Sequence, residues 1–419
     1  MLENRWRETA RRNATRLAVH DATSGRSWTF SELEAEADAA PPSASEGLSH
    51  PQGRDVGFLL AVLRAWRAGL PICPLEPGQS APVLPRPIPG FSLLKLTSGS
   101  TGTPRVVALD AAQVAADADQ IVRTMGLRPE WPNLGVLSLA HSYGFSNLVT
   151  PLLLHGIPLV LVDSPLPRSV AAAAAPWESI TLPAVPALWR SWHEADLIPR
   201  QVRLAVSAGA PLPLPLEQEV FERHGLKIHN FLGASECGGI AFDRSDVPRT
   251  DPTCVGLPLE GVEASVDEDG TLVVRGPAVA STYWPEPDPR LADGTYRSSD
   301  LVHRDDEGRL WLRGRVGDVI NVAGRKVFPG AVEQAALRHP AVLDCLAFGV
   351  PDSTGRGEAV GLVYSTREPI EDSDLRAFLS SNLSAWEVPR RWWHRPALGT
   401  DGRGKRPRHV WRAMLLGEG

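Results

Sequence analysis

The stretch LLKLTSGSTGTPRVVALD, from Leu93 to Asp110, decides the fold that we expect for this chain. It places six consecutive Ser, Thr and Gly residues, 97–102, between two runs of residues that favour β-strands. A loop of this kind offers hydroxyls and unhindered backbone N–H groups, which together suit an anion such as a nucleotide phosphate. The neighbouring sequence then indicates which kind of phosphate-binding fold contains the loop.

A helix is predicted only after the second strand. Asp110 is suited to cap it, apolar residues recur at helical spacing from Val114 to Met125, and Gly126 is suited to end it. A Walker loop would need G-x-x-x-x-G-K followed by Ser or Thr and would run straight into a helix, and the Rossmann fingerprint is also missing. The loop is therefore predicted to join strand to strand, which excludes both of these nucleotide-binding folds.

Composition points to a globular protein with small-molecule partners. The chain has 419 residues, 43% hydrophobic and 22% charged, which suits one large and one smaller domain. A formal net charge of -6 offers no broad positive field, so no nucleic-acid partner is expected. We expect no signal peptide and no membrane span, and four cysteines without a C-x-x-C pair favour a cytoplasmic location.

The pattern of strands and helices changes along the chain. Strands and amphipathic helices alternate to about residue 245, and short strands with tight turns follow over about 254–313. The rest is mixed, with helices expected from Pro329 to before Pro340 and after a Ser373 cap. We therefore expect an α/β fold: a large, multilayered N-terminal domain with a β-rich subdomain over 1–316, and a small, mobile α+β domain over 317–419.

Several motifs, in order along the chain, resemble those of the adenylate-forming superfamily of acyl- and aryl-CoA ligases, adenylation domains and luciferases. The opening loop resembles its phosphate-binding signature, and AHSYGFSN resembles its acyl-pocket motif. Motifs resembling the adenine, ATP/magnesium and remaining core segments follow: VSAGAPLP, FLGASECGG, VGLPLEGVEASV, LVVRGPAVASTYW, YRSSDL, GRVGDVINVAGRKVFPGAVE and GTDGRGKRPR. Their shared order and spacing over nearly the whole chain, rather than any single motif, carries the resemblance.

The resemblance implies which residues bind ATP. The loop would hold the β- and γ-phosphates, and the adenine would lie against the segments around Gly209 and Leu232. Asp300 would accept both ribose hydroxyls with its two oxygens, and Arg315 would assist. The implied nucleotide ligands are Thr97, Ser98, Gly99, Ser100, Thr101, Gly102, Gly209, Ala210, Pro211, Leu232, Gly233, Asp300 and Arg315.

The resemblance also implies a catalytic set and Mg²⁺. Joining a carboxylate to AMP brings two anions together, so the site has to neutralise charge at the α-phosphate and release pyrophosphate with Mg²⁺. Ser235 and Glu236 would reach the α-phosphate and the metal. Lys405, one of only four lysines, would bridge the substrate carboxylate and the α-phosphate, which suits an ammonium on a flexible stem.

The implied acid pocket consists of His141, Tyr143, Ser207 and Gly238, with His141 expected at the end of an apolar strand. Amino-acid-activating domains carry an aspartate after the acyl motif, and HSYGFSNLVTPLL has no acidic residue, which favours an acid without an α-amino group. The likeness of AVSAGAPLP and LGASE to aryl-CoA ligases favours an aryl acid.

The thiol-transfer step is implied by the last motifs of the chain. A swing of the small domain at the hinge residue Gly317 would admit a thiol along a path by Gly324. Arg105, Leu232 and Gly317 depart from the family pattern, which has lysine, an aromatic residue, and Asp or Lys at these places. Arg105 keeps the positive charge, Leu232 keeps an apolar contact, and Gly317 keeps the freedom of the backbone to rotate. The chain is also shorter than typical relatives upstream of the loop.

We therefore expect ATP-dependent adenylation of a small carboxylic acid to acyl-AMP and pyrophosphate, with Mg²⁺, followed by transfer to CoA or to carrier-protein phosphopantetheine. An acyl carrier protein is thus a candidate partner. Two alternatives would leave every ATP motif unchanged: an amine acceptor and an oxyacid other than a carboxylate. A third alternative is an inactive relative that binds AMP or an acyl ligand, and the retention of Asp300, Glu236 and Lys405 speaks against it. A serine hydrolase is not expected, because Cys237 stands where the elbow G-x-S-x-G needs glycine.

Overall fold

The computed structural model describes residues 1–45, 47–85, 88–97, 105–352, 357–399 and 407–417. The chain has a large sheet-rich unit and a smaller, mainly C-terminal unit, which confirms the predicted α/β class. The expected boundary between residues 316 and 317 stays a prediction. The first unit contains Met1–Ser265, Val273–Ser298 and Asp306–Leu310, and the second contains Val266–Leu272, Ser299–Asp305 and Trp311–Gly419.

A largely parallel sheet forms the centre of the first unit. Its strands run in the order β11-β10-β9-β8-β7-β5-β6-β1-β2, and the pairs from β9 to β1 are parallel. Parallel neighbours need crossover connections, and helices supply them. The strands are β1 (Leu17–Asp21), β2 (Ser27–Thr29), β5 (Asn133–Gly135), β6 (Leu159–Leu161), β7 (Ile180–Ala184), β8 (Val202–Ser207), β9 (Ile228–Ala234), β10 (Gly238–Phe242) and β11 (Cys254–Pro258).

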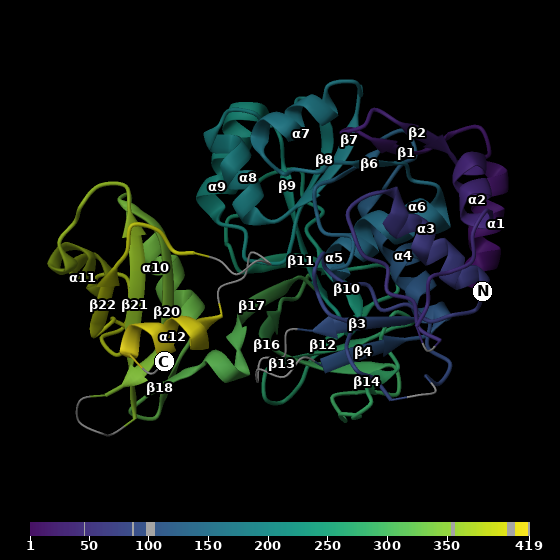
Figure 1. Ribbon diagram of the computed structural model, residues 1–419. Helices are drawn as coiled ribbons and strands as arrows, with labels where there is room; N and C mark the ends of the chain where they lie inside the picture. The colour runs from purple at the N-terminus through teal and green to yellow at the C-terminus, as the bar shows by residue number, and fades with distance from the viewer. Residues whose placement is uncertain (46, 86–87, 98–104, 353–356, 400–406, 418–419) are drawn as a thin grey trace. The chain divides into compact units, whose positions relative to one another are not determined.

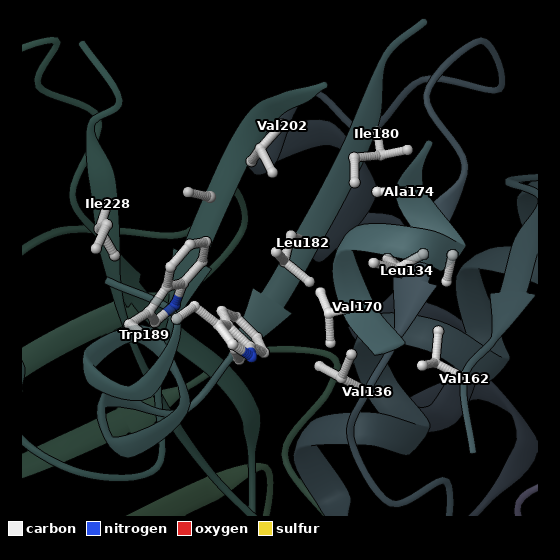
Figure 2. Close-up of a cluster of buried hydrophobic side chains, with 14 of the residues drawn as sticks. Leu134, Val136, Val162, Val170, Ala174, Ile180, Leu182, Trp189, Val202 and Ile228 are labelled. Atoms are coloured by element: carbon white, nitrogen blue, oxygen red, sulfur yellow. The ribbon is translucent and has the colours of Figure 1, made fainter. Parts of the chain in front are cut away.

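Three crossover helices, α7 (Pro167–Ala174), α8 (Pro186–Glu194) and α9 (Leu214–His224), lie beside β7, β8 and β9 (Figure 1). Their apolar faces and the strands enclose a buried cluster that includes Leu182, Trp189 and Trp192 (Figure 2). The Trp189 indole donates to the Val206 carbonyl at 3.2 Å, so even the polar atom of this large ring has a partner. Because this cluster is closely packed, it holds the carboxyl ends of β7, β8 and β9 in defined positions.

Four more helices of the first unit are α1 (Leu2–Arg12), α2 (Phe30–Asp38), α3 (Val56–Arg67) and α4 (Ala111–Met125). The predicted α4 is confirmed at both ends. Asp110 accepts from the Gln113 backbone N–H at 2.8 Å, and Gly126 ends the helix in the left-handed conformation, with φ 64°. The predicted strand-to-strand setting of the loop is also confirmed, because β3 (Leu93–Thr97) pairs antiparallel with β4 (Arg105–Leu109).

A second sheet, in the order β14-β4-β3, positions the predicted phosphate loop. β14 (Thr282–Trp284) comes from far along the chain and pairs antiparallel with β4. One face of this sheet is apolar and joins a buried cluster through Leu94, Val106 and Ala108. Because successive side chains alternate between faces, Lys95, Thr97, Arg105 and Tyr283 share the opposite face.

The acyl-pocket motif is helical, so the expectation that His141 ends a strand is wrong. His141 is the N-cap of a short helix, α5 (Ser142–Gly144), which continues into a π-helical turn (Phe145–Val149) and then α6 (Thr150–His155). Apolar runs of this length fit a buried helix as well as a strand, and this ambiguity misled the prediction. The predicted helix, turn and strand after this point are confirmed, with Gly156 turning the chain at φ 72°.

The predicted β-rich segment is confirmed, and the division between the two units runs through its strands. The second unit is built on the sheet β20-β21-β22 with the hairpin β18-β19. The elements of the β-rich segment are β12 (Glu263–Val266), β13 (Thr271–Arg275), β15 (Leu291–Ala292), β16 (Thr295–Arg304) and β17 (Leu310–Arg315). The elements that follow, all in the second unit, are β18 (Ile320–Val322), β19 (Arg325–Val327), α10 (Pro329–Leu337), β20 (Val342–Pro351), β21 (Glu358–Thr366), α11 (Asp372–Ser380), β22 (Arg391–His394) and α12 (Arg408–Leu416).

The helix expected after a Ser373 cap begins earlier than predicted. Glu371 is the N-cap, and Ser373 lies inside the first turn of α11. Two acidic residues, Asp372 and Asp374, occupy that turn, where carboxylates are favoured by the helix dipole. Asp372 also accepts a hydrogen bond from the Tyr364 hydroxyl, which ties the helix start to β21.

The four cysteines form no disulfide, and all four are buried. Cys73, Cys237 and Cys254 lie in the first unit, and Cys345 lies in the second. In the part of the chain that the structure describes, no helix has the length and apolar character needed to cross a membrane.

Candidate active site

The two strands that flank the predicted phosphate loop are held at the point where the loop leaves them. Thr97 and Arg105 are directly paired in the hairpin, and the Thr97 hydroxyl donates to the Arg105 carbonyl at 3.1 Å. Five of the six predicted loop ligands, Ser98, Gly99, Ser100, Thr101 and Gly102, lie outside the described residues. Their roles therefore stay predictions, while the two strands define where the loop begins and ends.

Arg105 is engaged by two neighbours. One guanidinium nitrogen donates to Asp288 at 2.9 Å, and the guanidinium carbon lies 3.8 Å from the centre of the Tyr283 ring. Asp288 also accepts from Arg290 at 2.8 Å. The hydrogen bond from Arg290, together with that from Arg105, holds the pKa of Asp288 well below its ordinary value. Asp288 is therefore a firmly ionised anchor for Arg105.

Tyr283 connects this cation to the predicted metal ligand. Its hydroxyl donates to Glu236 Oε1 at 2.8 Å, and the backbone N–H of Ala280 donates to the Glu236 carbonyl at 2.8 Å. Burial, and then the neighbouring Glu236 carboxylate, raise the pKa of Tyr283, so the hydroxyl stays a donor. The structure thus brings Glu236 next to the strands that flank the predicted phosphate loop.

Ser235 connects the ATP/magnesium motif to the acyl motif. Ser235 and Glu236 lie in the tight turn between β9 and β10. The Ser235 hydroxyl lies 2.7 Å from the Ser142 hydroxyl, at the start of α5 and one residue after His141. Two motifs that are 93 positions apart in the sequence therefore meet at one hydrogen bond.

Asp117, on α4, is a site residue that the sequence analysis missed. It is buried and accepts from the Gly239 backbone N–H at 3.0 Å and from the Ser146 hydroxyl at 2.5 Å. The predicted pocket residue Gly238 has φ 67°, and a Cβ atom there would lie well under 3.0 Å from the Asp117 carboxylate. Gly238 is therefore required by close approach as well as by its backbone conformation.

Lys95 is a second missed residue. It lies on the site face of β3, opposite Val107 and in one row with Tyr283, and only 6% of it is exposed. Burial lowers the pKa of Lys95, and the charge of Asp117 acts most strongly in the opposite direction. A signal was available, because only four lysines occur in the chain and this one lies in an otherwise apolar strand.

The acyl motif has an acidic neighbour from a distant segment. His141 Nε2 lies 3.2 Å from Glu76 Oε1, and the Ser138 hydroxyl also donates to Glu76. The motif itself contains no acidic residue, and the sequence alone did not predict this one. The predicted pocket residue Tyr143 donates weakly to the Ala184 and Val206 carbonyls, at 3.4 and 3.3 Å.

The adenine segment follows directly after β8. Ser207, the last residue of β8, is fully buried, and its hydroxyl finds no hydrogen-bond partner among the described residues. Gly209 turns the chain at φ 84°, and its neighbours Ala210 and Pro211 are half-buried and exposed, respectively. Leu232 and Gly233, on β9, are half-buried and exposed. The exposed backbone of these residues is suited to receive a flat ring.

A buried ionic network supports this segment. Arg249 donates to the Leu212 carbonyl at 2.8 Å, one residue after Pro211. Glu217, which is 0% exposed, accepts from Arg249 Nε at 2.8 Å and from Lys227 Nζ. Lys227 also donates to Asp243 at 2.7 Å. Two cations and two carboxylates thus neutralise one another, as buried charges require.

The remaining predicted site residues lie in the second unit. Arg315 Nε donates to Asp300 at 2.9 Å, so the predicted ribose carboxylate and its assistant contact each other. Gly317 lies in a short 3₁₀ helix (Val316–Asp318), and a Cβ atom there would meet nothing within 4 Å. Gly324 forms the β18-β19 turn at φ 83° and donates to the Asn321 side chain at 2.9 Å. Lys405 lies outside the described residues.

Glu236 fits a Mg²⁺–nucleotide complex. Mg²⁺ is usually bound in such complexes by one or two carboxylates together with phosphate oxygens and water. One Glu236 oxygen accepts from Tyr283, and the described part of the chain gives its second oxygen no hydrogen-bond partner. In the same ranges no group of three His, Cys, Asp or Glu side chains gathers as an all-protein metal cage. Glu236 is the carboxylate suited to supply one ligand to a metal that the nucleotide brings.

Comparison with known proteins assigns the family. Residues 91–284 match the family of AMP-binding enzymes, and residues 331–405 match the AMP-binding enzyme C-terminal domain. A sulfoacetate–CoA ligase from Cupriavidus necator is 29% identical over 360 residues, covering 81% of this chain and 70% of the relative. An anthranilate–CoA ligase from Pseudomonas aeruginosa is 31% identical over 338 residues, covering 74% of this chain and 64% of the relative.

The fold agrees with these matches. The crystal structure of ATP-bound MatB from Rhodopseudomonas palustris superposes with a TM-score of 0.86 at 19% identity, and the superposition covers 99% of both chains. The two matched regions together include more than half of the sequence, in the order in which the family's two domains occur. The chain therefore belongs to the AMP-binding, adenylate-forming enzymes.

Proposed function

We propose that this chain is an ATP-dependent acid ligase, which adenylates a small carboxylic acid and then transfers the acyl group to CoA. The meeting of the predicted motifs carries the proposal: Glu236 accepts from Tyr283, on whose ring the phosphate-loop residue Arg105 stacks, and Ser235 contacts the acyl-motif residue Ser142. Two named CoA ligases among its relatives support the acceptor.

The residues of the first unit divide the work of the adenylation step. Residues 97–102 bind the β- and γ-phosphates through hydroxyls and backbone N–H groups. Glu236 supplies a carboxylate to Mg²⁺, which when bound neutralises phosphate charge and helps pyrophosphate to leave. Ser235 binds the α-phosphate, while Gly209, Ala210, Pro211, Leu232 and Gly233 form the adenine site.

The second unit supplies the remaining groups. Asp300 accepts hydrogen bonds from the ribose hydroxyls, and Arg315 holds the Asp300 carboxylate in place. The hydrogen bond from Arg315 to Asp300 supports this arrangement. Lys405 neutralises the substrate carboxylate and the α-phosphate as they approach each other. Residues 317–419 form a mobile domain that turns at Gly317 and guides the thiol past Gly324. The protein works in the cytoplasm, where ATP and CoA are available.

The substrate is an aryl acid held between His141, Tyr143, Ser207 and Gly238. An anthranilate–CoA ligase among the relatives supports an aryl acid, and the Glu76 carboxylate beside His141 is suited to accept from an amino or hydroxyl substituent. The unpartnered Ser207 hydroxyl is a second polar group in the predicted pocket. The acid panel should therefore include benzoates with amino and hydroxyl groups at each ring position, besides unsubstituted aryl and short acyl acids.

Mass spectrometry tests this function. The protein is incubated with ATP, Mg²⁺ and each acid, and acyl-AMP is measured; CoA or a phosphopantetheinyl carrier protein is then added, and the acyl thioester is measured. We expect acyl-AMP from an aryl acid and acyl-CoA after CoA is added. Acyl-AMP that reacts only with the carrier protein would identify the carrier protein, and not CoA, as the acceptor. No acid-dependent acyl-AMP with any acid would refute the ligase activity and favour an inactive nucleotide-binding relative.

Lys405→Ala tests the assignment of the catalytic lysine. Removing one preorganised charge should lower the adenylation rate by about 10²- to 10³-fold. Lys326→Ala removes the same charge elsewhere in the second unit and should leave adenylation unchanged. Equal rates for the wild-type protein and Lys405→Ala, measured by pyrophosphate exchange into ATP with the acid found above, would exclude this role.

A further inference from the structure

Arg105 has the charge of the family's lysine but is engaged differently from a flexible ammonium. Its planar guanidinium stacks 3.8 Å from the centre of the Tyr283 ring and donates to Asp288 at 2.9 Å in the same conformation. A guanidinium can do both, because its flat face is available for the ring while its edge carries the donors. A lysine ammonium has no such face, so the two contacts together fit arginine.

Tyr283 is fixed on three sides by this arrangement. Its backbone pairs with Val107 in β4, Arg105 covers its ring, and its hydroxyl donates to Glu236 at 2.8 Å. The Glu236 backbone is tied nearby, through its carbonyl and the N–H of Ala280. The Tyr283 hydroxyl is the group that ties the end of the half-buried Glu236 side chain, so it restricts where the Glu236 carboxylate lies.

We infer that Tyr283 is a positioning residue for Glu236, and that Arg105 acts on the nucleotide site through Tyr283 rather than through a direct phosphate contact. The inference rests on the proposed function in taking Glu236 as the ligand of the Mg²⁺ that accompanies ATP. Tyr283 holds Oε1 and leaves the second oxygen to the metal. Glu236 would then offer Mg²⁺ a carboxylate that is already in place, which saves the cost of ordering that side chain.

The test is the effect of Mg²⁺ on ATP affinity, measured by calorimetry on the full chain without any acid. Tyr283→Phe keeps the ring and the stacked Arg105 but removes the hydroxyl. We expect the gain in ATP affinity caused by Mg²⁺ to fall about three- to tenfold, the scale of the net contribution of one ordinary hydrogen bond, while metal-free ATP affinity stays at the wild-type value. Glu236→Gln should lose the same gain, and adding Tyr283→Phe to it should change nothing further.

Two more variants separate positioning from general damage. Tyr364→Phe is the matched control, because it also removes a tyrosine hydroxyl bound to a carboxylate, Asp372, but in the second unit; it should leave the Mg²⁺ effect unchanged. Arg105→Lys restores the residue usual in the family and keeps the charge. If Arg105 acts through Tyr283, this variant should also reduce the Mg²⁺ effect and leave metal-free binding unchanged.

Several results would overturn the inference. An unchanged Mg²⁺ effect in Tyr283→Phe would exclude positioning, and a stronger one would mean that the hydrogen bond only withdraws charge from Glu236. A loss of metal-free ATP binding in Arg105→Lys would indicate a direct phosphate contact. These outcomes are read from ATP binding alone, so they remain distinct from a failure of the proposed ligase activity, which the acid panel measures.

Discussion

Gly238→Ala is the substitution whose cost the structure defines most sharply. The glycine has φ 67°, and an alanine there pays about 1–2 kcal/mol for the left-handed conformation. Its Cβ atom would also overlap the Asp117 carboxylate, which would have to move. Asp117 would then lose its hydrogen bonds from the Gly239 N–H and the Ser146 hydroxyl, each about 1.5–3 kcal/mol for a charged acceptor. We expect a total loss of about 4–8 kcal/mol in the free energy of unfolding.

Gly225→Ala is the matched control for this prediction. Gly225 has φ 62°, but a Cβ atom there would meet nothing within 4 Å, so only the conformational cost applies. Calorimetric unfolding of the first unit should therefore give a small shift of its midpoint for Gly225→Ala and a shift several times larger for Gly238→Ala. In an Asp117→Ala background the overlap is absent, and Gly238→Ala should cost no more than Gly225→Ala. Equal shifts for the two single variants would refute the reasoning.

Two further substitutions test the charges around the site. Glu217→Gln should lower the free energy of unfolding by about 3–5 kcal/mol, because it leaves two buried cations short of a carboxylate. The control is Glu219→Gln, which should cost under about 1 kcal/mol because the Glu219 side chain is 48% exposed. Equal costs for the two variants, measured by calorimetry, would contradict the prediction. Asp288→Asn tests the lowered pKa of Asp288, because the ionised carboxylate stabilises the fold above the ordinary carboxyl pKa. The melting temperature of the wild-type protein should therefore exceed that of the variant by its full amount near pH ~7, and the difference should shrink towards pH ~3. A difference that does not depend on pH would exclude this linkage.

Local signals in the sequence were sufficient for the elements that carry them. The Asp110 cap, the apolar spacing from Val114 to Met125 and the closing Gly126 all lie within α4 or directly beside it, and its predicted extent is confirmed. The strand-to-strand setting of the phosphate loop followed from the absence of a helix directly after it, and β3 and β4 confirm it. The motifs were likewise contiguous, and the assigned family confirms the resemblance they carried.

Contacts between distant segments could not be predicted from the sequence. Tyr283 reaches the site because β14 adds to β4 in one particular register, and no local pattern specifies that register. Asp117 has the spacing of an ordinary polar position on α4, and only the fold turns it towards the backbone of Gly239. Glu76 lies 65 positions before its partner His141, and no local pattern links the two. The predicted roles of the loop residues and of Lys405 stay predictions.

The buried thiols allow the free energy of local opening to be measured separately in each of the two units. A bulky alkylating reagent reaches a buried cysteine only when the surrounding structure opens, so its labelling rate reports the free energy of that opening. Cys345 reports on the second unit, and Cys237, directly after Glu236, reports on the turn that holds the proposed metal ligand. The labelling rates with and without ATP would therefore measure how much nucleotide raises the free energy of opening in each unit, and the natural cysteines suffice for this measurement.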